Sequence, residues 1–360
     1  MNPKIIFDYK TTLPKEANAP SVFIDDYSDN EYFVNFYTKD KNRESTEDKL
    51  PVKFICGGTC KGGQRIISGS HQWFDNWVII VSDNKGNLIA QDIFDPTGKV
   101  VFIKIDAYAL GDNIAWIPYI EEFRKKHNCT MICSTFFNNL FSKIYPNILF
   151  VEPNTNIDNV YAQYYIGAQN ENNIRYSRLV SDENPLQATA YINLGLQPEE
   201  LRPHLESQLK HRKYAKKYIC ISEYASHESK HWKYPNGWQT IVDFLVELDY
   251  DVVVISKEPT SLKNVINLTG NVSLIDRAQT LLDAECFIGL SSGLSWLSWA
   301  VGTHVIMISD VTPINHEFKG NITRVCANPN LQKVDYNASE VSSAYEVIEK
   351  IKSYLNQIAQ

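Results

Sequence analysis

The chain has 360 residues, of which 44% are hydrophobic and 21% are charged, and its formal net charge at pH 7 is −7. That length accommodates two domains with an added module, and the negative charge argues against general affinity for nucleic acid or anionic membranes. No apolar stretch is long enough to span a bilayer, and the N-terminus lacks the charged and apolar regions of a signal peptide. We therefore expect a cytoplasmic globular protein.

Seven cysteines, an odd number in a chain without an export signal, predict reduced thiols. Cys56 and Cys60 lie in the sequence CGGTC, where glycines could fold a loop around a metal ion. Two thiols without further nearby ligands are only a weak indication of zinc, so we predict no metal site. The cysteines in apolar strand patterns are expected to pack in the core: Cys129, Cys133, Cys220 and Cys286.

Residues 1–99 differ from the rest of the chain in their short alternating runs of apolar residues, at 32–37, 52–55 and 77–81. Turn signals such as DNKGN at 83–87 separate the runs. This pattern is typical of antiparallel hairpins and predicts a β-rich N-terminal module over residues 1–99. An aromatic cluster in it forms either a hydrophobic core, which we favour, or a surface for another protein: His71, Gln72, Trp73, Phe74 and Trp77.

From residue 100 onward, strand and helix patterns alternate. The first set predicts strands at 100–105, 129–134, 148–151 and 161–166, with helices at 113–126 and 136–144. A polar, proline-containing segment from about 168 to 215 follows, with a helix at 185–195 before a linker. The second set predicts strands at 218–222, 251–255, 286–290 and 304–308, with helices at 236–248, 275–284 and 293–301.

Strand and helix in alternation, with short connections, predict parallel sheets with right-handed crossovers. We therefore expect an α/β fold of two Rossmann-like domains that face a cleft, one over residues 100–215 with a linker and one over residues 216–360 with a terminal helix. Neither half has G-x-G-x-x-G after its first strand, which disfavours an ordinary dehydrogenase.

Two loops at predicted strand ends carry candidate functional residues. In the first, Gly111 would allow a tight turn. Asp112 is either a helix cap, the favoured interpretation of this stretch alone, or a carboxylate at the C-terminal edge of a strand, where open sheets build active sites. In the second, residues 223–232, Lys230 is either a solvated lysine or a point charge that neutralises a diphosphate between the domains.

A third loop, residues 289–296, runs from a strand into a helix whose first backbone amides are free. Ser291 or Ser292 could cap these amides, or the amides could hold a phosphate at the positive end of the helix. A serine-capped helix with a glycine turn would account for this loop by itself. The joint placement of all three loops favours a functional site.

These stretches resemble the bacterial autotransporter heptosyltransferases, which are relatives of the lipopolysaccharide heptosyltransferases with the GT-B fold. The resemblance covers roughly residues 50–330 and rests on LGDNIAW at 110–116, KHW at 230–232 with the NGWQT helix, and GLSSGLSWLSWA at 289–300. The lipopolysaccharide enzymes typically have an acid and a threonine before the glycine and a histidine after the serine. This chain has Ser291, Ser292 and Trp296 there.

The resemblance implies transfer of heptose from ADP-heptose to serine hydroxyls of an autotransporter adhesin in the cytoplasm, with residues 100–215 on the acceptor side and residues 216–360 binding the nucleotide sugar. Asp112 matches the family's essential acid, as general base or to position the hydroxyl, and Lys230 matches its essential lysine. No D-x-D metal motif is evident, so Lys230 and helix amides would neutralise the ADP leaving group.

The donor contacts that we predict from the resemblance and the three loops come from both halves of the chain. Ser222, Glu258 and Leu274 are assigned to adenine and ribose. The full set is Ala109, Leu110, Gly111, Asn113, Ser222, Ser226, Glu258, Leu274, Ser291, Ser292, Gly293 and Leu294.

One feature of the family is missing. The family commonly ends with a cysteine-rich iron-binding finger, whereas no cysteine follows Cys326 in this chain. A four-cysteine iron site is therefore not expected, which places the ring-like assembly that the finger supports in doubt and leaves a homo-oligomer as an open alternative.

Two other functions agree less well with these residues. A lipopolysaccharide core heptosyltransferase is disfavoured by the β-rich module and the Ser291-Ser292-Gly293 sequence, and would also be expected to carry a basic or amphipathic membrane-facing stretch. A non-catalytic subunit of a glycosylation complex is disfavoured by the presence of both Asp112 and Lys230.

Overall fold

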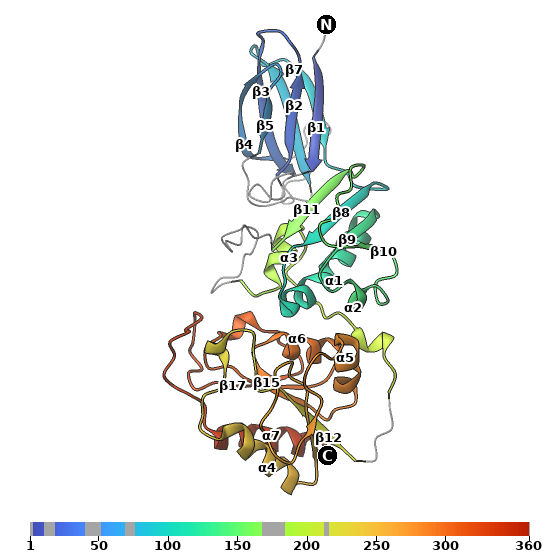
Figure 1. Ribbon diagram of the computed structural model, residues 1–360. Coiled ribbons are helices and arrows are strands. Elements are labelled where there is room, and N and C mark those ends of the chain that lie inside the picture. The colour runs from blue at the N-terminus through green and yellow to red at the C-terminus, as the bar shows by residue number, and fades with distance from the viewer. Residues whose placement is uncertain are drawn as a thin grey trace.

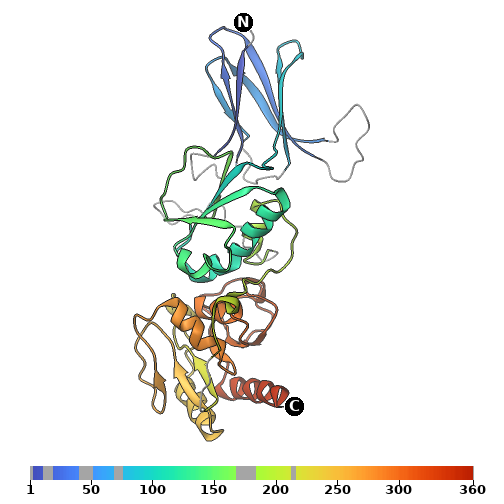
Figure 2. The same cartoon turned by 90° about the vertical axis from the view of Figure 1, so that its right-hand side faces the viewer.

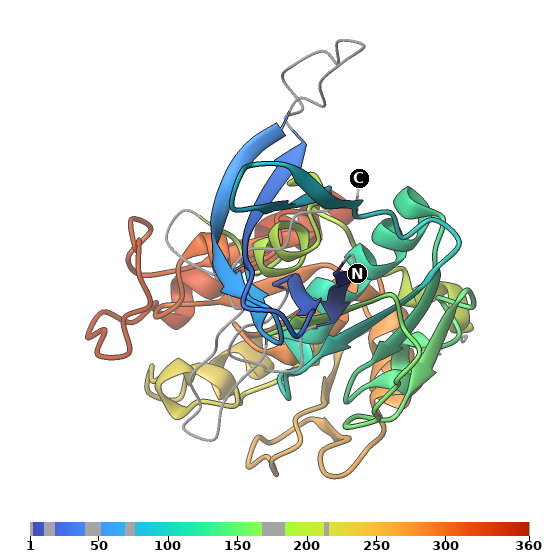
Figure 3. The ribbon, with the colours of Figure 1, turned by 90° about the horizontal axis from the view of Figure 1, so that it is seen from above.

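The computed structural model describes residues 3–10, 19–39, 52–68, 76–167, 184–211 and 216–359. Within these ranges the strands form three sheets, of seven, six and four strands. Figure 1 shows an elongated molecule of three tiers, with a β-rich module at the N-terminal end, one α/β domain in the middle and a second at the C-terminal end. Figure 2 shows the same tiers at a right angle, and Figure 3 shows the module from above, over the middle domain.

The strands of the β-rich module are β1 (Lys4–Lys10), β2 (Ser21–Asp25), β3 (Glu31–Lys39), β4 (Val52–Lys61), β5 (Arg65–Ile67), β6 (Trp77–Asp83) and β7 (Leu88–Ile93). One sheet has the order β4-β3-β6-β7 and is antiparallel throughout, as the hairpin pattern predicts. A second layer consists of β1, β2 and β5 (Figure 1). Buried apolar side chains from both layers, among them Ile24, Phe36 and Ile79, belong to one core.

The sheet of the module runs on into the middle domain. β1 pairs in parallel with β11 (Ala162–Ile166), where Tyr9 lies opposite Ala162. Tyr9 is buried, and its ring packs against Phe94 and Tyr161 with centroid distances of 5.0 and 5.4 Å. The change of sequence pattern near residue 99 thus marks a change in connectivity, while the sheet itself continues in space.

The middle domain contains β8 (Val100–Ile105), α1 (Leu110–His127), β9 (Thr130–Ser134), α2 (Asn138–Phe141), β10 (Ile148–Val151) and β11. Its strands are parallel in the order β10-β9-β8-β11, which confirms the predicted βα alternation. The helix predicted at 136–144 is too long, since α2 has only four residues. The side chain of Asn138 accepts a hydrogen bond from the backbone of Thr135 and donates one to Val151, which fixes a tight turn there instead.

The C-terminal domain contains β12 (Tyr218–Ile221), η3 (Glu228–Lys230), α4 (Gly237–Glu247), β13 (Asp251–Val254), β14 (Ile266–Asn267), α5 (Leu274–Leu282), β15 (Phe287–Leu290), α6 (Gly293–Ala300), β16 (Val305–Ile308), η4 (Ile314–His316), β17 (Ile322–Val325) and α7 (Ala344–Ile358), where η marks a 3₁₀ helix. The sheet is parallel in the order β14-β13-β12-β15-β16-β17. The predicted strands and helices are present, with bounds that differ by up to two residues. The short strands β14 and β17 were not predicted.

The segment between the two α/β domains covers α1 and reaches α6. It contains α3 (Ala188–Asn193) and the 3₁₀ helix η2 (Leu205–Gln208), so the helix predicted at 185–195 is shorter than expected. Trp116 Nε1 on α1 donates a 2.8 Å hydrogen bond to the Leu186 carbonyl, and Arg202 Nη1 donates a 3.1 Å bond to the carbonyl of Ala300 at the end of α6. Because this segment packs on α1 opposite the sheet, α1 is buried on more than one side.

The sequence CGGTC is not a loop, because Cys56 and Cys60 both lie in β4 and pair with β3. Residues four apart on an extended strand are separated by about 13 Å, too far for the two thiols to share one metal ion. A Cβ atom on Gly57 would lie 2.2 Å from Asn35 Oδ1, so glycine permits the close approach of these strands.

The core interpretations of the other cysteines and of Trp77 agree with the structure. The four cysteines predicted to pack in the core are buried, at Cys129, Cys133, Cys220 and Cys286. Trp77 is fully buried, whereas the other four members of the predicted aromatic cluster, at 71–74, lie outside the described residues. No helix in the described ranges is long and apolar enough to cross a membrane.

Candidate active site

The first predicted loop lies at the C-terminal end of β8, where the chain enters α1. The buried side chain of Asn113 donates hydrogen bonds to the carbonyl oxygens of Ala107, at 2.7 Å, and Ala109, at 2.9 Å, and thereby fixes the entry to the helix. Ala109 is the N-cap residue, and Asp112 lies in the first turn, 5% exposed. The prediction that Asp112 caps the helix is therefore wrong, and its carboxylate lies at the positive end of the α1 dipole.

The third predicted loop connects β15 to α6. Its N-cap residue, Ser292, makes no side-chain capping hydrogen bond, so a cap by Ser292 is not formed. Ser295 donates a 2.5 Å hydrogen bond to the Leu290 carbonyl and ties the first turn to the end of the strand. The first amides of this eight-residue helix thus keep the ability to bind an anion.

The N-terminal ends of α1 and α6 meet across the boundary between the α/β domains. A Cβ atom on Gly111 would lie 2.9 Å from Trp296 Cδ1, and a Cβ atom on Gly293 would lie 2.9 Å from Leu110 Cβ. Carbon atoms pack at about 3.5 Å or more, so both positions require glycine. The prediction that Gly111 serves a tight turn is wrong, since it lies inside α1 and allows the second domain to approach.

Replacing Gly293 by alanine should loosen this contact. The added methyl group would overlap the Leu110 Cβ, which is attached to the backbone and cannot swing away. We expect Gly293→Ala to lower the free energy of unfolding by about 1–3 kcal/mol, measured by urea denaturation. The matched control is Gly320→Ala, whose Cβ would lie 3.8 Å from the nearest atom, and whose effect should stay within about 0.5 kcal/mol. Equal stability of the two variants would show that the contact is not tight.

Lys230 connects the second predicted loop to the third. It ends the 3₁₀ helix η3, its side chain is half-buried, and its Nζ donates a 3.3 Å hydrogen bond to the carbonyl oxygen of Ser291. The lysine therefore lies against the loop that leads into α6. Because α6 in turn packs on α1, all three predicted loops come together, which the sequence could suggest only from their placement at strand ends.

The other predicted donor residues lie along the C-terminal ends of the second domain's strands. Ser222, directly after β12, is fully buried with its Oγ 3.2 Å from Ser256 Oγ. Ser226 and Glu258 are exposed in the loops after β12 and β13, and Leu274 is the first residue of α5. Their contacts with a nucleotide stay predictions, as do those of Ala109, Leu110, Asn113, Ser291 and Leu294.

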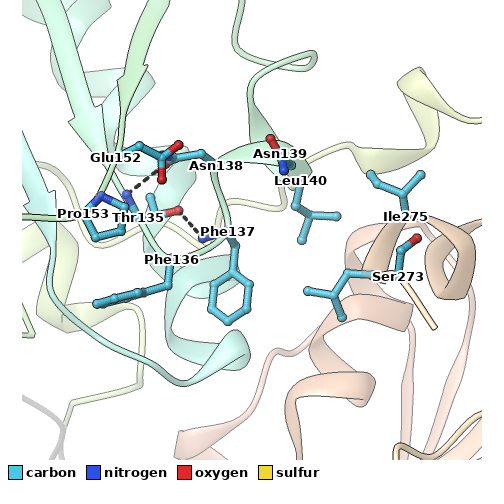
Figure 4. A pocket seen from close by; sticks show the side chains of 11 residues that line it. Thr135, Phe136, Phe137, Asn138, Asn139, Leu140, Glu152, Pro153, Ser273 and Ile275 are labelled. Atoms are coloured by element: carbon cyan, nitrogen blue, oxygen red, sulfur yellow. Dashed lines mark hydrogen bonds between the residues drawn. The ribbon is translucent and has the colours of Figure 1, made fainter. Parts of the chain in front are cut away.

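A cavity of about 520 Å³ lies between the two α/β domains (Figure 4). Phe136 and Phe137, in the loop after β9, belong to one wall, and Ser273 and Ile275, at the start of α5, belong to the other. The Phe136 ring stacks on Tyr108 with centroids 4.1 Å apart, which connects this wall to the loop before Asp112. Sequence reasoning missed both phenylalanines because it predicted a helix at 136–144 and no loop facing the other domain.

Among the described residues, the cysteines do not fit the four-cysteine iron site of the family that the sequence resembles. The described part of the chain has no group of three or more His, Cys, Asp or Glu side chains able to hold a metal ion. Burial raises the pKa of the Cys326 thiol, which donates a 3.0 Å hydrogen bond to the Asn328 carbonyl.

Two α/β domains with parallel sheets, whose helix N-termini meet at their boundary, form the GT-B architecture expected from the sequence. The structure aligns with the crystal structure of the bacterial iron-containing dodecameric glycosyltransferase TibC from enterotoxigenic E. coli H10407 at a TM-score of 0.82, 20% identity, over 99% of this chain and 96% of that chain. It also aligns with dodecameric iron-containing heptosyltransferase TibC in complex with ADP-D-β-D-heptose at a TM-score of 0.78, 20% identity, over 98% and 96%. The predicted fold is thereby confirmed.

Residues 172–326 match the model described as glycosyltransferase family 9 (heptosyltransferase). The chain is 35% identical over 236 residues to the autotransporter heptosyltransferase Aah of Escherichia coli, which covers 61% of this chain and 59% of Aah. It is 30% identical over 269 residues to the inactive autotransporter heptosyltransferase BimC of Burkholderia thailandensis, which covers 71% of this chain and 63% of BimC. The chain thus spans less than two thirds of the length of these relatives.

Proposed function

We propose that this protein transfers heptose from ADP-heptose to serine hydroxyls of an autotransporter adhesin before the adhesin is exported. The observation that carries the proposal is the convergence of Asp112, Lys230 and the N-terminus of α6 at the boundary between the α/β domains. The relatives support the choice of donor, since Aah is an autotransporter heptosyltransferase and TibC has been crystallised with ADP-D-β-D-heptose.

Asp112 supplies the negative charge on the acceptor side. A serine hydroxyl is a weak nucleophile at neutral pH, and a carboxylate within hydrogen-bond reach can accept its proton or position it. As the serine oxygen bonds to the anomeric carbon of the heptose, the bond from that carbon to the diphosphate oxygen breaks and ADP leaves. Asp112 lies in the first turn of α1, and the hydrogen bond of the Asn113 side chain to the preceding loop fixes the backbone of this turn.

Lys230 and α6 supply the positive charge on the donor side. The ADP leaving group gains negative charge as its bond to the sugar breaks, and an ammonium group and free helix amides stabilise that charge. The hydrogen bond from Lys230 Nζ to the Ser291 carbonyl keeps the ammonium group beside the first turn of α6. Both donors of positive charge are therefore in place before the diphosphate arrives.

The acceptor and the activity are tested by measuring ADP released from ADP-heptose. An adhesin fragment should stimulate release, and the same fragment with its serines replaced by alanine should not. Stimulation by lipopolysaccharide core in place of the adhesin would identify a core heptosyltransferase. Binding of ADP-heptose without release in either case would identify a non-catalytic subunit, a second candidate favoured by the 30% identity to the inactive relative BimC.

We expect ADP to bind without a divalent metal ion, because Lys230 and helix amides provide the positive charge. Calorimetry should give the same dissociation constant, within about twofold, in magnesium and in excess chelator. Elemental analysis should find neither iron nor zinc in the purified protein. Loss of ADP binding in chelator, or about one metal ion per chain, would contradict this prediction.

A further inference from the structure

A buried acid lies next to the donor side of the candidate site, at a position that the sequence patterns do not single out. Glu317 directly follows η4 and is 4% exposed. The next residue, Phe318, stacks on Trp299 of α6 with ring centroids 5.0 Å apart. This anchor holds the backbone of Glu317 against α6, inside the second domain.

The carboxylate of Glu317 is held by one hydrogen bond and one ion pair inside the second domain. Ser309 Oγ donates a 2.7 Å hydrogen bond to Oε1, and Arg324 Nη1 lies 3.5 Å from Oε2. The Ser291 hydroxyl and the Lys230 ammonium group both favour the ionised form of Glu317 and so act to lower its pKa. Arg324 on β17 and Lys230 on η3 are thus two cations that act on the charge of Glu317.

The balance of these interactions leaves Glu317 able to change charge near neutral pH. Burial raises the pKa of Glu317 to about 7, although Arg324, Ser309, Lys230 and Ser291 all act to lower it. The Arg324 guanidinium also donates to the carbonyl oxygens of Ser309, at 3.1 Å, and of Thr312. Arg324 therefore keeps hydrogen-bond acceptors when Glu317 is neutral.

We propose that Glu317 is a positioning residue of the donor site, which balances the charge of Lys230 in the empty protein and takes up a proton when an ADP diphosphate binds. This rests on the proposed function, because it places the diphosphate at Lys230 and α6. A diphosphate there adds negative charge beside a poorly solvated carboxylate, and like charges at short range disfavour ionisation. The proton comes from solvent to a carboxylate oxygen, and no other bond changes.

The affinity for ADP should depend on pH, because the charge of Glu317 does. Because its pKa is raised to about 7, Glu317 is less ionised at pH 6 than at pH 8.5 in the empty protein. Only the ionised form repels the diphosphate, so ADP should bind the native protein more weakly at pH 8.5 than it binds Glu317→Gln. Each unit by which ADP raises the pKa of Glu317 corresponds to roughly a tenfold difference in affinity. A purely structural role would instead weaken binding at both pH values.

The experiment is isothermal titration calorimetry of ADP in paired buffers of low and high ionisation enthalpy, which counts the protons exchanged on binding. Near pH 7 the native protein should take up a fraction of a proton per ADP more than Glu317→Gln, because the carboxyls that start ionised gain a proton when ADP binds. ADP's own phosphate titration is common to both proteins and cancels in the difference. The glutamine keeps an oxygen to accept from Ser309, and Arg324 keeps its carbonyl partners.

Two further variants test whether the proton uptake comes from Glu317. Ser309→Ala keeps the acid but removes a hydrogen bond that favours its ionised form, so the pH of maximal proton uptake should rise. Glu121→Gln is the matched control, because Glu121 is also a buried acid, 9% exposed and bonded to Arg124, but lies at the far part of α1. Its proton uptake should equal that of the native protein.

The outcomes separate this proposal from the proposed function. Equal proton uptake by the native protein and a folded Glu317→Gln, with ADP bound by both, would overturn the role of Glu317 and leave the donor site intact. Uptake unchanged in Ser309→Ala across pH 6 to 8.5 would also count against it. Absence of ADP binding to the native protein would overturn both proposals at once.

Discussion

Asp112→Asn should reduce heptose transfer by about 100-fold or more while ADP binding changes by less than about twofold. An amide of the same size cannot accept the serine proton, but it leaves the diphosphate contacts of the other domain untouched. Because Ala109 and not Asp112 is the N-cap residue of α1, loss of a cap does not enter the comparison. Removing a first-turn acid should cost only about 0.3–1 kcal/mol of stability.

The control for Asp112→Asn is Glu122→Gln on the same helix. Glu122 pairs with Lys125 at 2.9 Å on the exposed surface, so this variant makes the same charge change away from the candidate site. Its transfer rate should stay within about twofold of the native rate. Near-normal transfer by a folded Asp112→Asn protein would remove Asp112 from the mechanism, and with it the acceptor side of the proposal.

Lys230→Met should weaken donor binding and turnover together. Its charge meets the diphosphate both in the bound ground state and in the transition state, so removing it acts on both. A hydrogen bond to a charged group contributes about 1.5–3 kcal/mol, which corresponds to roughly a 10- to 150-fold loss of ADP affinity. Calorimetry measures the affinity, and ADP release measures turnover.

Lys233→Met is the matched control for Lys230→Met. Lys233 lies three residues further along the same loop and is exposed. Lys233→Met removes the same charge from the same loop, so this variant should bind ADP almost as tightly as the native protein does. If both variants bound ADP equally well, the positive charge of the donor site would have to come from elsewhere.

Local patterns were enough to predict most of the second and third tiers. The apolar run at 100–105 and the helical spacing after it identify β8 and α1, because a buried parallel strand and a helix differ in length and period. The same reasoning located the loops of Asp112, Lys230 and Ser292 at strand ends. In a parallel α/β fold those ends share one edge of each sheet, so their approach could be anticipated.

Features that depend on partners distant in sequence could not be read from local patterns. The glycine at 111 resembles a turn residue until Trp296 is placed against it. CGGTC resembles a loop until β3 pairs with all of it. Glu317 resembles a surface acid, and only its burial against Ser309 and Arg324 sets it apart. In each case tertiary contacts overrode what the neighbouring residues suggested.

The most direct test of the whole account is the intact mass of an adhesin fragment incubated with ADP-heptose and this protein. We expect mass to be added in steps of one heptosyl unit, with the native protein and with Glu122→Gln, and to be absent or at least about 100-fold slower with Asp112→Asn. No added mass with native protein that binds ADP-heptose would contradict catalysis. Equal addition by Asp112→Asn would contradict the site built at the junction of α1 and α6.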